Sequence, residues 1–77
     1  MIMTNYRTIA RLKDGGHKIF RIDVGQVAHI VTEFKKLKRQ LFPKDVDINV
    51  HGETLTLNDV SSLLFINEWT GEKLNLA

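Results

Sequence analysis

The strongest constraint on the fold is one stretch of helical periodicity, between Gln26 and Phe42. Its apolar side chains recur at every third or fourth position, and they are Val27, Ile30, Val31, Phe34, Leu37 and Leu41. This spacing puts them on one stripe of a helix whose remaining surface is polar. We expect the helix to begin at Asp23 or Gly25 and to end at Pro43, because proline cannot continue a helix. The stripe has to be buried against a second layer of structure.

Two segments before this helix alternate apolar and polar residues, as strands do. They run from Tyr6 to Lys13 and from His17 to Val24, and Asp14-Gly15-Gly16 between them favours a turn. We expect a three-residue loop that pairs Lys13 with His17 and Arg7 with Asp23. A two-residue loop would set Lys13 against Lys18, and like charges directly opposed destabilise a sheet. The expected register leaves one apolar face, made of Tyr6, Thr8, Ala10, Leu12, Phe20, Ile22 and Val24.

The residues after Pro43 also show the alternation that is typical of strands. Residues 46–50 alternate apolar and polar side chains, His51-Gly52-Glu53 favours a turn, and Leu55 and Leu57 continue the alternation. A short strand is expected at residues 73–76.

Residues 58–67 allow two structures. Val60, Leu63 and Leu64 fit a helix capped by Asn58 or Asp59, but they also fit a turn followed by a strand. We favour the strand, because paired serines and a Phe-Ile pair are more typical of a turn and a strand than of a helix.

Together these patterns predict one α+β domain over residues 1–77, with two layers. One amphipathic helix packs on an antiparallel sheet of about five strands, in the order β-β-α-β-β-β. A chain of 77 residues without cysteine has no disulfides, so its stability has to come from packing or from a partner. The absence of cysteine suits a reducing compartment, and no apolar run approaches the roughly 20 residues that span a bilayer. We expect a cytoplasmic protein that does not enter the membrane.

The charges are divided along the chain. Residues 1–44 carry ten basic and three acidic side chains, whereas residues 45–77 carry one basic and six acidic side chains, and the net charge is +2. This division bears on the choice of partner, because clustered charges attract macromolecules of opposite charge.

Motifs for chemistry are weak. Asp45, Asp47 and Asn49 copy the first ligands of a calcium loop, but its sixth position is Val50 instead of glycine and its twelfth is Thr56 instead of glutamate. The three histidines, His17, His29 and His51, fit no ligand spacing. We therefore expect a protein that is not an enzyme and has no catalytic, cofactor-binding or metal-binding residues.

The favoured function is that of a small non-enzymatic binding or accessory protein that docks on another protein or on itself. A small sheet with one helix leaves part of its surface and an edge open to partners. The candidate anchors are large aromatic residues at the ends of elements, Tyr6, Phe42 and Trp69. No small-molecule substrate is indicated.

The alternative function is nucleic-acid binding through the basic hairpin and the basic flank of the helix. Lysine and arginine side chains that gather on one face neutralise phosphates and release counterions. The candidate contacts are Arg11, Lys13, Lys18, Lys35, Lys36 and Arg39.

Overall fold

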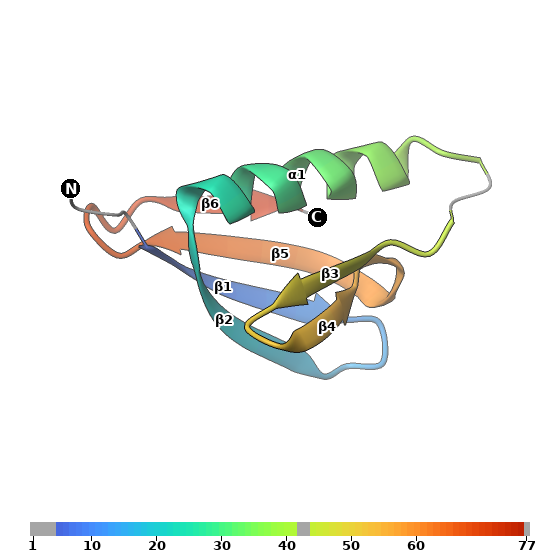
Figure 1. Ribbon diagram of the computed structural model, residues 1–77, viewed down its shortest axis with the longest axis horizontal. Coiled ribbons are helices and arrows are strands. Elements are labelled where there is room, and N and C mark those ends of the chain that lie inside the picture. The colour runs from blue at the N-terminus through green and yellow to red at the C-terminus, as the bar shows by residue number, and fades with distance from the viewer. Residues whose placement is uncertain (1–4, 42–43, 77) are drawn as a thin grey trace.

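The structure, a computed structural model that describes residues 5–41 and 44–76, has an α+β fold (Figure 1). Its elements in chain order are β1 (Asn5–Leu12), β2 (His17–Asp23), α1 (Val24–Lys38), β3 (Asp47–Val50), β4 (Glu53–Thr56), the 3₁₀ turn η1 (Leu57–Asp59), β5 (Val60–Asn67) and β6 (Lys73–Leu76). The predicted fold class is confirmed, with one helix packed on a mostly antiparallel sheet.

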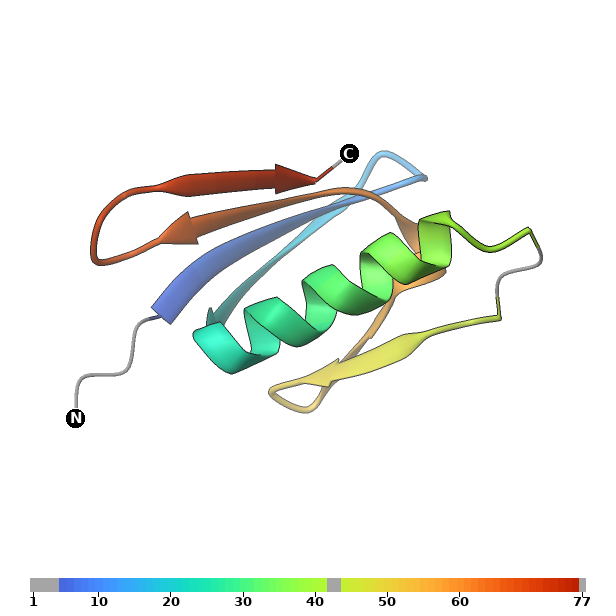
Figure 2. The same cartoon turned by 90° about the horizontal axis from the view of Figure 1, so that it is seen from above.

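The strands form two sheets. The larger sheet is antiparallel and has the strand order β2-β1-β5-β6, and the β3–β4 hairpin forms the smaller sheet. The helix α1 lies across one face of the larger sheet, and the hairpin lies alongside the helix, next to β2 (Figures 1 and 2). The side chain of Lys18 on β2 reaches the Thr54 carbonyl on β4, at 3.5 Å from Nζ to O. The described residues therefore contain six strands, one more than predicted, and two of them are set apart from the main sheet.

The hydrophobic core lies between α1, the larger sheet and the hairpin. The helix contributes Val27, Ile30, Phe34 and Leu37; the sheet contributes Ala10, Phe20, Ile22, Val60, Leu63 and Phe65; the hairpin and η1 contribute Val50, Leu55 and Leu57. All of these side chains are buried. Burial of the apolar stripe explains why the segment with helical periodicity forms a helix in this chain. Packing of an amphipathic face supplies most of a helix's stability in a protein.

The cap at the start of α1 was predicted correctly, and the end of the helix was not. The Asp23 carboxylate accepts a hydrogen bond from the Gln26 amide at 2.9 Å, which confirms Asp23 as the capping residue. The predicted end at Phe42 and Pro43 is wrong, because the helix ends at Lys38. Leu41 is 91% exposed, and residues 38–40 are exposed as well, so none of the described side chains that follow Leu37 in this segment is buried to hold a further turn. Phe42 and Pro43 themselves lie outside the described residues.

The register of the β1–β2 hairpin also required correction. Arg11 pairs with His17 and Arg7 with Arg21, so the three-residue loop is Lys13-Asp14-Gly15 and lies one residue earlier than predicted. Gly15 has φ of 97°, which is the left-handed conformation that the third residue of such a loop adopts. The shift moves the pairing by two residues, so each side chain keeps the face that was predicted for it.

The strand prediction for residues 58–67 is confirmed, since β5 occupies Val60–Asn67 after the short η1 turn. Asn58 does not cap a helix. Its side-chain oxygen accepts from the Val46 amide at 2.8 Å, and the Leu57 amide donates to the Val46 carbonyl at 2.9 Å. These bonds tie η1 to the start of the β3–β4 hairpin.

Candidate interaction surface

One face of the larger sheet points away from α1, and we call it the outer face. Successive residues of a strand point to opposite faces, and Thr8, Phe20 and Phe65 point to the core. The strand pairings then place the following side chains on the outer face: Arg7, Ile9, Arg11, His17, Ile19, Arg21, Ser62, Leu64, Ile66, Lys73 and Asn75. Within residues 5–41 and 44–76, no helix or strand covers this face (Figure 1).

Aliphatic side chains occupy the centre of the outer face. Ile9 on β1 is paired with Ile19 on one side and with Leu64 on the other, and Ile66 lies two residues beyond Leu64 on β5. We call these four residues the aliphatic row. Ile19 is 60% exposed, and the other three are half-buried. Contiguous apolar side chains that remain in contact with water mark interaction surfaces more often than single exposed ones do.

Basic side chains surround the aliphatic row. Arg7 and Arg11 lie on either side of Ile9 along β1, and Lys73 on β6 is paired with Ile66. We call Arg7, Arg11 and Lys73 the cationic rim. Within residues 5–41 and 44–76, the one ion pair shorter than 4.0 Å joins Arg21 to Glu68, so no carboxylate of these residues lies within 4.0 Å of the nitrogens of the rim.

The Arg21–Glu68 pair explains how two arginines can face each other across β1 and β2. Arg21 donates two hydrogen bonds to Glu68, from Nε at 2.8 Å and from Nη2 at 2.7 Å. These bonds lower the pKa of Glu68 below its usual value, and the nearby charge of Arg7 contributes to the same shift. The same contact raises the pKa of Arg21. Glu68 thus offsets part of the repulsion between Arg7 and Arg21.

The candidate nucleic-acid contacts lie on different parts of the molecule. Arg11 is on the outer face, whereas Lys35 and Lys36 are exposed on α1, on the other side of the sheet, and Arg39 caps that helix. Lys18 is half-buried on the helix side of β2, and Lys13 follows β1. The fold therefore does not gather the six residues on one face.

The candidate aromatic anchors are also separated. Tyr6 is half-buried against the core, and its hydroxyl accepts a hydrogen bond from Asn67 Nδ2 at 3.3 Å. Trp69 is 74% exposed in the turn between β5 and β6. Phe42 lies outside the described residues. Of the two anchors that lie within the described residues, Trp69 is thus the exposed one.

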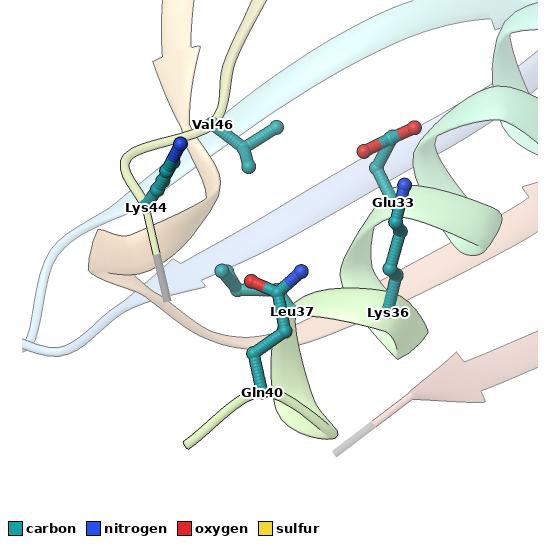
Figure 3. Close-up of a pocket in the computed structure, with 6 residues that line it drawn as sticks. All are labelled: Glu33, Lys36, Leu37, Gln40, Lys44 and Val46. Carbon is teal, nitrogen blue, oxygen red and sulfur yellow. The ribbon is translucent and has the colours of Figure 1, made fainter. Parts of the chain in front are cut away.

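Two hollows border the C-terminal half of α1. The first measures about 330 Å³ and is lined by Glu33, Lys36, Leu37, Gln40, Lys44 and Val46, with α1 on one side and the segment before β3 on the other (Figure 3). The second measures about 400 Å³ and lies near Phe34, between Lys13 and Lys38. Both are open to water, and side chains of both charge signs line the first. They are grooves between elements and do not have the enclosed, mostly apolar lining of a typical small-molecule site.

The residues of the calcium-like motif make bonds within the hairpin. Asp47 accepts a hydrogen bond from the Thr56 hydroxyl at 2.8 Å, and Asn49 accepts one from the Gly52 amide at 3.1 Å. In the part of the chain that the structure describes, no three histidine, aspartate or glutamate side chains come together as metal ligands would. No helix within the same residues has the length and the apolar composition needed to cross a membrane.

The aliphatic row was not among the candidate residues from the sequence, although a signal for it existed. Once Thr8 and Ala10 are assigned to the core, Ile9 has to point away from it, and the same holds for Ile19 between Lys18 and Phe20. An isoleucine at a solvent position is common by itself. The row becomes visible only when the pairing of β1 with β5 is known.

Comparisons of the chain with protein-family models, with curated proteins and with solved structures found no match.

Proposed function

We propose that this chain is a small non-enzymatic docking protein that binds another protein through the outer face. The observation that supports the proposal is the aliphatic row of Ile9, Ile19, Leu64 and Ile66 on a sheet face that no described element covers. A partner that covers this row removes apolar surface from water, and the favourable free energy of burial is about 25 cal/mol for each Å². The cationic rim gives the same surface a charge preference.

A protein partner fits the outer face better than nucleic acid does. Sheet surfaces that bind single-stranded RNA stack its bases on aromatic side chains. On the outer face the positions at the centre hold isoleucine and leucine, and Phe20 and Phe65 point to the core instead. The Glu68 carboxylate, in the turn after β5, also lies beside the basic residues of this face and pairs with Arg21. Its negative charge weakens the attraction of a polyanion.

A foreign partner fits better than a second copy joined face to face. Such a dimer would bring Arg7, Arg11 and Lys73 of one copy toward the same residues of the other. Like charges set against each other at an interface oppose binding. The rim therefore acts against pairing through this face.

Photocrosslinking tests the proposal. A photoreactive amino acid replaces Ile19 on the outer face, or Thr32 on the exposed side of α1 as the matched control, in cells that express the protein. We expect a protein adduct from position 19 that is absent from position 32 and is lost when Ile9→Asp is added. A thermal melt checks that the Ile9→Asp variant is folded. Equal adducts from both positions, or none from position 19, would refute the proposal, and nucleic acid crosslinked at position 19 would favour the alternative function.

A further inference from the structure

The size of the outer face suits a single segment of a partner. Residues 5–11 of β1 extend over about 20 Å, and four strands with their side chains are about 20 Å wide. This area is roughly half of the 800 Å² or so that each protein contributes to an interface of standard size. The aliphatic row from Ile19 through Ile9 to Leu64 spans about 10 Å between its end strands, which matches the diameter of one helix.

The basic side chains around the aliphatic row favour a partner segment that carries carboxylates. Arg7 and Arg11 lie four residues apart on β1, so their Cα atoms are about 13 Å apart, with Ile9 halfway. A helix rises about 1.5 Å per residue with about 3.6 residues per turn, so carboxylates seven or eight residues apart lie about 11–12 Å apart on one side of the helix and can reach both arginines. Lys73 lies two strands away, beyond Ile66, and can pair with a carboxylate on the opposite flank of the same helix.

We infer that the outer face binds an acidic amphipathic helix of a partner protein, whose apolar stripe covers the aliphatic row and whose carboxylates pair with the cationic rim. The inference rests on the proposed function, because it names the partner segment for the same surface. In the complex the sheet lies between two helices, with α1 on one face and the partner helix on the other.

A synthetic peptide provides the test. The probe has about 18 residues, long enough for a helix to be populated, with leucines at helical spacing and glutamates on both flanks. A second peptide has lysine at every glutamate position. Binding of each labelled peptide to the full chain is measured by fluorescence anisotropy. We expect saturable binding of the acidic peptide that weakens as salt rises, and weaker binding of the basic peptide.

Two double variants with the same change in net charge locate the site. Arg7→Glu with Arg11→Glu reverses two charges on the rim, and Lys35→Glu with Lys36→Glu reverses two exposed charges on α1. We expect the dissociation constant for the acidic peptide to rise about tenfold or more in the rim variant, because each exposed pair is lost and replaced by repulsion. It should change by less than about threefold in the helix variant, where only the long-range charge differs. The rim variant should bind the basic peptide more tightly than the parent does, and this gain also shows that the variant is folded.

Several results would overturn the inference. They are equal weakening by both double variants, no weakening by either, or no saturable binding of the acidic peptide to the parent. Tighter binding to a DNA duplex or to anionic phospholipid vesicles than to the peptide would overturn it in favour of those ligands. A protein adduct at position 19 together with failure of the peptide would reject the acidic helix and leave the docking function intact.

Discussion

Replacement of Phe34 by alanine tests whether α1 is held by packing on the sheet. The Phe34 side chain is 2% exposed and lies on the buried stripe between Ile30 and Leu37. Truncation of a buried phenylalanine costs about 3–5 kcal/mol, and the cost is higher where the cavity stays empty. Phe34 borders the second hollow, where Lys38 Nζ lies 4.8 Å from the ring centroid. Because water can reach this side of the cavity, we expect the lower end of the range, about 3 kcal/mol.

A loss of that size is a large part of the stability of the domain. A chain of 77 residues has a free energy of unfolding of about 4–12 kcal/mol. For a domain of this size each kcal/mol shifts the melting temperature by about 4–8 °C, so the Phe34→Ala variant should melt about 12–24 °C below the parent. Circular dichroism during heating measures the melting temperature, and circular dichroism during urea titration measures the free energy of unfolding. Far-ultraviolet dichroism is the suitable signal because Trp69 is 74% exposed and does not report on the core.

The control is Leu41→Ala, because Leu41 is 91% exposed. Surface substitutions of this kind change stability by about 0.5 kcal/mol at most, so its melting temperature should stay within about 4 °C of the parent. A Phe34→Ala variant that melts within the same interval would refute the packing of the helix on the sheet. Equal losses in both variants would show that the helix continues beyond Lys38 and buries Leu41.

Three further predictions concern single side chains. The Thr8 hydroxyl is buried without a hydrogen-bond partner among the described residues, so Thr8→Val should raise the free energy of unfolding by about 1 kcal/mol; a lower melting temperature would show that the hydroxyl has a partner. Asp23→Ala removes the helix cap and should cost about 1 kcal/mol, whereas Asp23→Asn, which keeps the acceptor, should cost much less; equal losses would contradict capping. The pKa of Glu68 is lower in the folded chain than its usual 4.5, so its pairing with Arg21 stabilises the fold above that pH and this contribution disappears as the pH falls through the folded value. The parent should therefore exceed Glu68→Gln in melting temperature at pH 7 and lose that lead in acid and in high salt, and a lead that is independent of pH would argue against the ion pair.

Local patterns in the sequence determined most of the secondary structure. The helical spacing of Val27, Ile30, Phe34 and Leu37 requires a helix with one buried stripe, and Asp23 supplies its cap within the same segment. Alternation in the flanking segments identified the strands and the faces of their side chains. These features depend on residues within a few positions of one another, so they can be read without knowledge of the rest of the chain.

The tertiary structure decided the end of the helix, the partition into two sheets and the outer face. The helix ends at Lys38 because no core remains for Leu41 to enter, which depends on where the sheet and the hairpin lie. The aliphatic row exists because β1 pairs with β5, more than fifty residues away in the chain, and so brings Leu64 beside Ile9. The same pairing brings Glu68 to Arg21. The packing of α1 on the other face of the sheet separates its basic residues from those of the outer face. The sequence by itself determines which side chains of a strand share a face. Only long-range pairing determines which strands lie next to each other, because the backbone hydrogen bonds between two strands are the same whether the strands are near or far apart in the chain.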